Sequence, residues 1–548
     1  MTETHVSSVL QTVERQIQFL TARQHRGGWV GLWFLPDGRA EAQVAGEPIR
    51  IIKLSHGTSP SIAQVILRAG QTFGRSEWIE SAGRFVSVLR DAECPNGGWP
   101  LYVWIEDDGR LQPMPAYWQH DDGPPRGVMK NGCTTNSVLF LLYYGLTQND
   151  REAQRLAKKG TAFLLQAQDA NALGLWCNTY PILPTDDPFG NCEAGLADDS
   201  ATPSALWVLR ALYGTTGNAD YLARLTRAAQ KVAQLFDFND KTAGWARYYD
   251  RSGRACDARV IEKATNIETR SGIELVVALI EAHRLIGDPR LLEPCRRWSS
   301  FMIDAMTCDQ TPGWHEHYDR TTGQPVHFDG RNEDGVGTEV SGKAALALLQ
   351  FGLHAGDDRA VDAARRYADF LIDRFPSAGW WATGYHRHSG QPLSYDWRNH
   401  QWTAAHDAMI HATPLALLTE LAKTTSQPRY LDAAARAAQR LAQLQLDCGG
   451  WAFTYQTDTN QPAGGVWQPG RKDLARDPDA KHPFMHVCQS IYASESGIGN
   501  QIIAWELMNL ADLLQGRPDI HHWQTTYGMP VPFLLNRHRP TASPERDA

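Results

Sequence analysis

A short pattern, Gly-Trp followed by an aromatic residue about four positions later, recurs seven times along this chain of 548 residues. Its tryptophans follow one another at intervals of 66 to 77 residues, at Trp29, Trp99, Trp176, Trp245, Trp314, Trp380 and Trp451. A near-constant period of this kind is typical of repeat architectures, in which each unit buries its apolar face against its neighbours. We therefore read the chain as one repeating structure, although its length alone would suggest several domains.

Each period contains two helical segments of different character. The segment before the Gly-Trp is amphipathic, with apolar residues three or four positions apart, as in 221–238 and 430–445. The segment after the irregular loop is apolar on nearly all sides, as in 202–214 and 271–285. Because a helix that is apolar all round must be covered by protein, we predict seven inner helices wrapped by seven outer ones. The inner helices are predicted to start near residues 58, 132, 202, 268, 338, 408 and 497.

The two ends of the chain are predicted to close a ring. The chain begins with an outer-type helix near 6–24 and ends with an inner-type helix near 498–515, so each supplies the partner that the other lacks. We predict an all-α fold, a single (α/α)7 toroid over residues 1–530 that forms the catalytic domain, with short β-hairpins in the Gly-Trp loops. Residues 531–548 are predicted to be a loose tail. We expect at least five of the seven tryptophans to lie buried between the layers.

Composition excludes several classes of function. A net charge of −8 without a basic stripe argues against a nucleic-acid partner, and no apolar run approaches the roughly 20 residues of a membrane span. The first twenty residues lack the features of a signal peptide, and the nine cysteines contain no CxxC pair, which favours reduced thiols. We therefore expect a cytoplasmic protein without a cofactor, and the sequence predicts no oligomeric state.

The predicted geometry places the functional site on one face of the ring. Short connections lie on one face, and the long Gly-Trp loops on the other face lead into the N-termini of the inner helices. Helix N-termini favour anionic groups such as carboxylates and phosphates, and long loops on a rigid scaffold commonly carry binding residues. The sequence thus predicts a central cleft for an anionic oligosaccharide or other small molecule.

Polar residues are dense at the predicted starts of the inner helices. Helix capping is an alternative explanation for Asn131, Asp198 or Asp199, and Ser494. Capping does not explain Arg270, His406 or His411, because cations are disfavoured at a helix N-terminus. The residues expected to bind the substrate are Arg270, Arg247, His56, Asn136, Asp199, Glu268, Glu339, Asp407, His411 and Glu495.

Histidines in the loops raise the question of a metal. His315 and His317 are two apart and would share a face of a strand, and His482 and His486 would share a face of a helix. Neither pair is completed by a cysteine or carboxylate at a spacing typical of zinc sites, so no metal is predicted.

Three segments resemble those of pectate lyases with an α/α-toroid fold, over about a third of the chain. They are NGGWPLY at Asn96, GWARYYDRSGR at Gly244 and TNIETRSG at Thr265. The resemblance implies a polysaccharide or oligosaccharide lyase, or a uronyl epimerase, that acts on sugars containing uronic acid. Such lyases are usually exported, whereas this chain shows no export signal.

A second resemblance is to triterpene and diterpene cyclases. QLDCGGW at Gln445 is similar to their Gln-Gly-Trp repeats, and LADDSAT at Leu196 is similar to their Asp-rich motif. However, Leu196 stands where that motif has its first aspartate, and the helices of those enzymes are usually divided between two barrels. A terpene cyclase-like ring is therefore kept as an alternative.

Lyase or epimerase chemistry makes definite demands on the site. Removing the proton beside a uronate carboxylate requires a cation or strong donor, a base and an acid, and a lyase then completes β-elimination. Arg270 or Arg247 could bind the carboxylate through two parallel hydrogen bonds. The candidate proton carriers are His406, Tyr248, Tyr385 and His315.

Three further functions remain open. An inverting glycoside hydrolase would need two separated carboxyl groups, for which Glu268, Glu339, Asp407 and Glu495 are candidates. The other two are a different kind of sugar isomerase and a ring that binds sugars without turning them over.

Overall fold

The computed structural model describes most of the chain. The described residues are 3–29, 43–44, 47–48, 51–55, 58–114, 125–180, 192–196, 201–257, 264–306, 310–326, 335–396, 401–403, 405–452, 454–456, 459–460, 500–517, 522–524 and 530–532. In this part of the chain no helix is both long enough and apolar enough to cross a membrane. The structural statements below refer to these residues.

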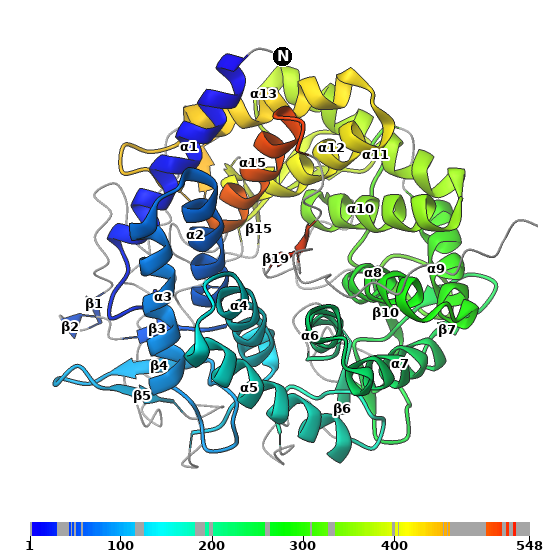
Figure 1. Cartoon of the computed structure of the whole chain (residues 1–548). Coiled ribbons are helices and arrows are strands. Elements are labelled where there is room, and N and C mark those ends of the chain that lie inside the picture. The colour runs from blue at the N-terminus through cyan, green and yellow to red at the C-terminus, as the bar shows by residue number, and fades with distance from the viewer. Residues whose placement is uncertain are drawn as a thin grey trace, which may run out of the picture.

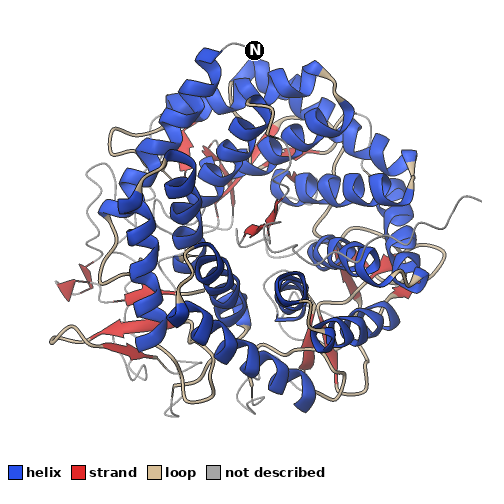
Figure 2. Ribbon diagram, viewed as in Figure 1, coloured by secondary structure: helices blue, strands red, loops and turns tan. Residues whose placement is uncertain are grey.

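The described helices form two concentric layers of one ring (Figures 1 and 2). The inner helices are α2 (Ser59–Phe73), α4 (Cys133–Thr147), α6 (Ala201–Thr216), α8 (Thr269–Ile286), α10 (Thr338–Ala355), α12 (Ala412–Thr425) and α15 (Asn500–Leu514). The outer helices are α1 (Glu3–Ala22), α3 (Ser76–Asp91), α5 (Arg151–Ala170), α7 (Ala219–Gln234), α9 (Leu292–Ala305), α11 (Asp358–Ala378) and α13 (Pro428–Leu444). Short 3₁₀ helices, η1 (Lys130–Gly132), η3 (Pro289–Leu291) and η4 (Ala408–His411), precede α4, α9 and α12.

This arrangement confirms the predicted all-α toroid with seven inner and seven outer helices. Five of the inner helices begin within one residue of the predicted starts. The turn at 408 is the 3₁₀ helix η4, after which α12 begins at Ala412, and α15 is described from Asn500. One ring, rather than two barrels, accounts for the described helices.

The ring closes through the first and last helices. α15 packs against both α1 and α2, and the Arg68 guanidinium of α2 forms a buried ion pair with Asp512 of α15 at 2.9 Å. The Gln445 side chain donates a hydrogen bond to the carbonyl of Thr12 across the same junction, at 2.9 Å. The predicted pairing of the chain ends is therefore confirmed.

Short connections join each inner helix to the next outer helix. After α8 and α10 the chain turns at a glycine in the left-handed conformation, Gly287 or Gly356. The next residue, Asp288 or Asp357, accepts hydrogen bonds from backbone N–H groups at the start of the following helix. This glycine–aspartate pair ends one helix and caps the next, which keeps this face of the ring compact.

The strands are short and antiparallel, and those that introduce inner helices lie on the opposite face. The strands before inner helices are β3 (Ile51–Lys53), β6 (Cys192–Gly195), β10 (Asn266–Glu268), β12 (Gly335–Gly337) and β16 (Ala405–Asp407). Each pairs with a strand that follows the next Gly-Trp: β4 (Tyr102–Ile105), β9 (Tyr248–Asp250), β11 (His317–Asp319), β13 (Gly384–His386) and β17 (Thr454–Gln456). The other strands are β1 (Gln43–Val44), β2 (Glu47–Pro48), β5 (Leu111–Pro113), β7 (Asp237–Phe238), β8 (Ala243–Gly244), β14 (Pro392–Asp396), β15 (Gln401–Thr403), β18 (His522–Gln524) and β19 (Pro530–Pro532).

This pairing differs from the local hairpins that the sequence suggested. Local hairpins do occur, as between β4 and β5. The five pairs that introduce inner helices instead join strands separated by an entire inner and outer helix. Each pair therefore ties the start of one inner helix to the Gly-Trp loop of the following outer helix.

The repeated tryptophans are buried and share one hydrogen bond. In every repeat an indole N–H donates to a carbonyl of the preceding outer helix, at 2.6 to 3.0 Å. The pairs are Trp29–Leu20, Trp99–Leu89, Trp176–Leu164, Trp245–Val232, Trp314–Met302, Trp381–Leu371 and Trp451–Leu441. The predicted burial is confirmed for all seven positions. In the sixth repeat, however, Trp381 makes the bond rather than its neighbour Trp380.

We predict that this hydrogen bond contributes measurably to stability. Trp245→Phe removes both ring volume and the bond to Val232, whereas Trp298→Phe removes similar volume from a buried indole whose N–H has no partner among the described residues. Trp245→Phe should therefore lower the free energy of unfolding by about 1 kcal/mol more than Trp298→Phe. Urea denaturation followed by circular dichroism measures the difference, and equal losses would contradict it.

Candidate active site

A set of tyrosines shows which loop residues face the outer layer. The fourth residue after the hydrogen-bonded tryptophan is tyrosine in five consecutive repeats, and the last four of these tyrosines are buried: Tyr249, Tyr318, Tyr385 and Tyr455. Each buried hydroxyl accepts a hydrogen bond from the backbone N–H three residues earlier, at 2.9 to 3.2 Å. Tyr249 and Tyr455 also donate to carbonyls at the ends of outer helices. Burial raises the pKa of all four phenols above the ordinary range.

Tyr385 therefore occupies a packing position. Its hydroxyl accepts the N–H of Ala382, and its ring meets Phe370 of α11 edge-on at 5.1 Å. We do not include it among the proton carriers, because it faces the outer layer and its phenol is held neutral.

The residues just before these tyrosines face the other way. Successive strand residues point to opposite faces, so Tyr248 and His317 point away from the outer layer and toward the centre of the ring. Each lies directly opposite the last residue of the strand that leads into an inner helix. We call these juxtaposed residues the rim pairs: Lys53–Tyr102, Gly195–Tyr248, Glu268–His317, Gly337–Gly384 and Asp407–Thr454.

The Glu268–His317 rim pair places a carboxylate and an imidazole together. Directly opposite residues of an antiparallel pair share a face, with Cβ atoms about 5 Å apart. Both side chains are buried. One Glu268 oxygen accepts from Arg247 Nη1 at 2.7 Å, and the other accepts from the Ser271 hydroxyl at 3.0 Å. The carboxylate is thus held rigidly beside the histidine.

Arg270 lies in the first turn of α8 and joins two neighbouring repeats. Its Nε donates to Glu316 at 2.6 Å, and its Nη2 approaches Glu339 of α10 at 3.3 Å. Glu339 also accepts from Lys343 at 2.8 Å. The Arg270 side chain keeps 19% of its surface exposed, so it remains at the loop end of the ring. The expected cation is present there, but two carboxylates already contact it.

These contacts decide the ionisation of Glu339. Burial alone would raise its pKa, but Lys343 and Arg270 outweigh burial and hold the pKa at about 2. A general acid must carry a proton near the working pH. Glu339 therefore does not fit the role of proton donor in an inverting hydrolase.

Three other predicted residues are buried near the starts of inner helices. The carbonyl of His315 accepts from the Thr269 hydroxyl at 2.7 Å, and its ring packs edge-on against Tyr318. His411 packs edge-on against Trp381, with ring centroids 5.5 Å apart. Asn136 lies in the first turn of α4 and is 1% exposed.

The structure does not describe the side chains of the remaining predicted residues. His56, Asp199 and Glu495, and likewise Asp198, Ser494, His482 and His486, lie outside the described residues. His406 and Asp407 are described as backbone in β16, opposite Tyr455 and Thr454. Over the part of the chain that is described, no three His, Cys, Asp or Glu side chains are grouped to hold a metal ion.

Sequence reasoning missed Lys53, Tyr102 and the pairing of His317 with Glu268. Lys53 and Tyr102 are buried and form the rim pair that introduces α2. The signal for Tyr102 and His317 was their position, three residues after the repeated tryptophan.

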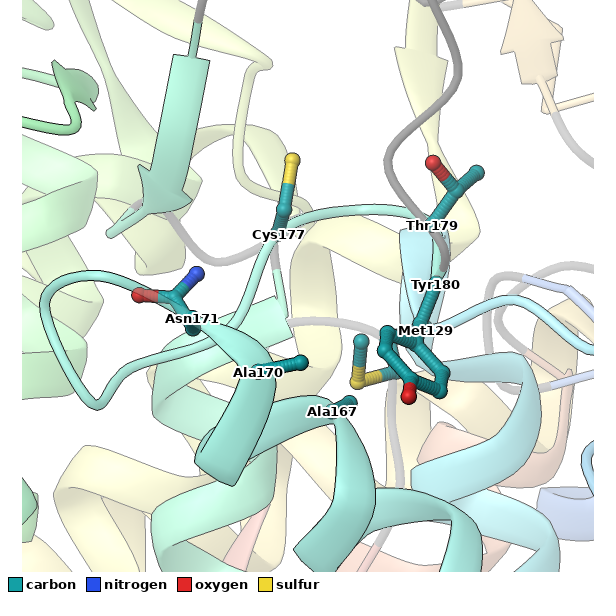
Figure 3. Close-up of a pocket in the computed structure, with 7 residues that line it drawn as sticks. All are labelled: Met129, Ala167, Ala170, Asn171, Cys177, Thr179 and Tyr180. Carbon is teal, nitrogen blue, oxygen red and sulfur yellow. The ribbon is translucent and has the colours of Figure 1, made fainter.

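A cavity of about 220 Å³ lies beside the loop of the third repeat (Figure 3). It is lined by Met129, Ala167, Ala170, Asn171, Cys177, Thr179 and Tyr180. Its wall is mainly apolar and contains no carboxylate or histidine, so it does not overlap the Glu268–His317 pair.

No protein-family model and no curated sequence matches this chain. Among solved structures, it is similar to cellobiose 2-epimerase from Bacillus thermoamylovorans B4167 (10% identity, 93% of this chain and 100% of that chain, TM-score 0.49). It is also similar to cellobiose 2-epimerase from Spirochaeta thermophila DSM 6192 (13% identity, 94% and 99%, TM-score 0.49). A third is unsaturated glucuronyl hydrolase from Bacillus sp. GL1 (14% identity, 72% and 92%, TM-score 0.42). Likenesses this distant do not identify an activity.

We predict that the ionised Glu339 makes stability depend on pH. Its pKa of about 2 lies below the ordinary 4.5, so its stabilising effect is complete above pH 4.5 and is lost as the pH falls toward 2. A shift of this size corresponds to at most about 3 kcal/mol. Wild type should therefore lose more stability than Glu339→Gln between pH 6 and pH 3.

Thermal unfolding midpoints across that range test this prediction. Glu293→Gln is the control, because Glu293 pairs with Arg297 on the exposed side of α9. Its midpoints should fall in parallel with those of wild type. A parallel fall for Glu339→Gln as well would show that Arg270 and Lys343 do not hold the carboxylate as the geometry indicates.

Proposed function

We propose that this chain is a carbohydrate-active enzyme that moves protons on sugars containing uronic acid, as a lyase or an epimerase. The observation that carries the proposal is the Glu268–His317 rim pair, in which a fixed carboxylate lies beside an inward-facing imidazole. Tyr248 faces inward from the preceding repeat. Imidazole and phenol are groups that can take up and return a proton.

The proposed reaction begins with a proton on the carbon beside the substrate carboxylate. The partly exposed Arg270 guanidinium is the candidate cation for the substrate carboxylate. His317 removes the proton, and the Glu268 carboxylate stabilises the imidazolium that forms. Tyr248 returns a proton, either to the opposite face of the same carbon, which inverts it, or to the departing oxygen, which completes β-elimination. His406 of β16 is a further candidate proton carrier.

The arginines have supporting parts in this proposal. Arg247 holds Glu268, and Arg270 links the starts of α8 and α10 through Glu316 and Glu339. Both guanidiniums hold these carboxylates in place, so that the proton carriers need not move before the reaction.

The inverting hydrolase remains the second candidate, although Glu339 does not fit as its acid. An experiment in D₂O separates the two. An epimerase returns a solvent proton to carbon and so leaves deuterium on a sugar carbon. A lyase instead forms an unsaturated uronate that absorbs ultraviolet light. Hydrolysis does neither. A sugar-binding ring would give no product.

We predict that wild-type protein, incubated in D₂O with uronate oligosaccharides, gives a carbon-bound deuterium signal by NMR or an unsaturated uronate by absorbance. His317→Gln and Tyr248→Phe should each lower the rate by at least about 100-fold, because each removes a proton carrier. Their melting temperatures should stay close to that of wild type.

The matched control is His283→Gln. His283 lies in the last turn of α8, at the opposite face of the ring, so this variant should keep the wild-type rate. A new reducing end with neither deuterium on carbon nor an unsaturated uronate would replace the proposal with the hydrolase. A wild-type rate in His317→Gln would show that His317 is not the base.

A further inference from the structure

The start of α4 contains buried polar side chains that the protein does not satisfy. Asn136 is 1% exposed, and neither atom of its amide has a hydrogen-bond partner among the described residues. The Thr135 hydroxyl and the amide oxygen of Asn178 are likewise buried and unpartnered in the described part of the chain. Buried polar atoms nearly always find a partner. Two of these residues lie in the first turn of α4 and the third lies in a loop that contacts the segment before it, which points to a bound ligand.

The Asn136 side chain is directed at the N-terminus of its own helix. A Cβ placed on Gly132, the residue that precedes α4, would lie 2.5 Å from Asn136 Nδ2 and 3.0 Å from its Oδ1. Only glycine leaves room for this approach, and Gly132 also adopts a left-handed conformation with φ of 70°. No side chain caps α4. The amide therefore lies at the positive end of a helix of 15 residues.

A buried cation stands beside the same helix. Lys53 belongs to the rim pair that precedes α2 and is 1% exposed. Its ammonium is close enough to Cys133, the first residue of α4, to oppose the effect of burial on the pKa of that thiol. α2 and α4 pack against each other in the inner layer.

Asn178 approaches from the next loop. Its carbonyl accepts the backbone N–H groups of Met129 and Lys130, at 2.8 and 3.0 Å, so it lies against the segment that leads into α4. The cavity of Figure 3 adjoins this segment, because Met129 lines it and Cys177 and Thr179 flank Asn178.

We propose that the start of α4 is the subsite that holds a uronate unit of the substrate. The carboxylate lies between the Lys53 ammonium and the Asn136 amide N–H, at the N-terminus of the helix. The amide oxygens of Asn136 and Asn178 accept hydrogen bonds from the sugar hydroxyls. This inference rests on the proposed function for its choice of ligand, and it concerns a uronate unit other than the one whose proton His317 removes.

Isothermal titration calorimetry with glucuronate, glucose and inorganic phosphate tests the subsite. Wild type should bind glucuronate at least tenfold more tightly than glucose. Asn136→Leu should weaken glucuronate binding at least tenfold and raise the melting temperature, because an unsatisfied amide is replaced by an apolar group of similar shape. An asparagine with a purely structural role would give the opposite change in melting temperature.

Two further variants sharpen the test. Lys53→Met should abolish the preference for glucuronate over glucose. Thr161→Val is the matched control, since Thr161 is a buried hydroxyl of outer helix α5 without a partner among the described residues. It should raise the melting temperature without changing glucuronate affinity.

The contrary outcomes are distinct. Unchanged glucuronate affinity in Asn136→Leu, equal affinity of wild type for glucuronate and glucose, or binding of phosphate alone would each overturn the subsite. Deuteration of a sugar carbon that survives Asn136→Leu would overturn the subsite and leave the proposed function standing. Glucuronate binding that is lost in Asn136→Leu supports the subsite even where no turnover is found.

Discussion

The hydrogen bond from each buried indole to the preceding outer helix determines the geometry of everything that follows it in the loop. It anchors a tryptophan side chain between the layers, and the tyrosine four residues later packs on the same side. Since successive strand residues alternate between faces, the residue just before the tyrosine must point toward the centre of the ring. One structural interaction, repeated around the ring, thus sets which side chains a ligand can meet.

Much of this fold follows from the sequence because its causes are local. The period of the Gly-Trp pattern, the striped and uniformly apolar helices, and the unpaired helix at each end are sufficient for a closed two-layer ring. In the sixth repeat, the sequence also indicates which of two adjacent tryptophans makes the hydrogen bond. Both Trp380 and Trp381 follow Gly379, but only Trp381 has a tyrosine four residues later, and only Trp381 makes the repeated hydrogen bond.

The candidate site could be predicted only in part, because its contacts join distant segments. Glu268 and His317 face each other through strands separated by an inner and an outer helix. The sequence predicted that Arg270 binds a substrate anion, because a cation is disfavoured at a helix N-terminus. The carboxylates that explain it, Glu316 and Glu339, come from the next loop and the next inner helix. Their approach depends on the ring's curvature, which no local pattern encodes.

Charge is distributed unevenly around the described rim, and this suggests a division of labour. Between α8 and α10, three cations and three carboxylates form ion pairs with one another, which makes a rigid sector. At α4, the buried Lys53 lies near Cys133, the first residue of that helix. A rigid sector suits proton transfer between fixed groups, whereas the sector at α4 suits the capture of a charged sugar.

The rim pairs on either side of Glu268–His317 leave space for such a sugar. Gly195 precedes it and Gly337 follows it, so the strand that leads into the inner helix carries no side chain at these two positions. A Cβ on Gly337 would meet no described atom within 4 Å, and the extended backbone there would accept any residue. Steric demand on the backbone therefore does not require glycine at 337. The missing side chain leaves room beside the acid–imidazole pair, where the proposed function places the reacting carbon of the sugar.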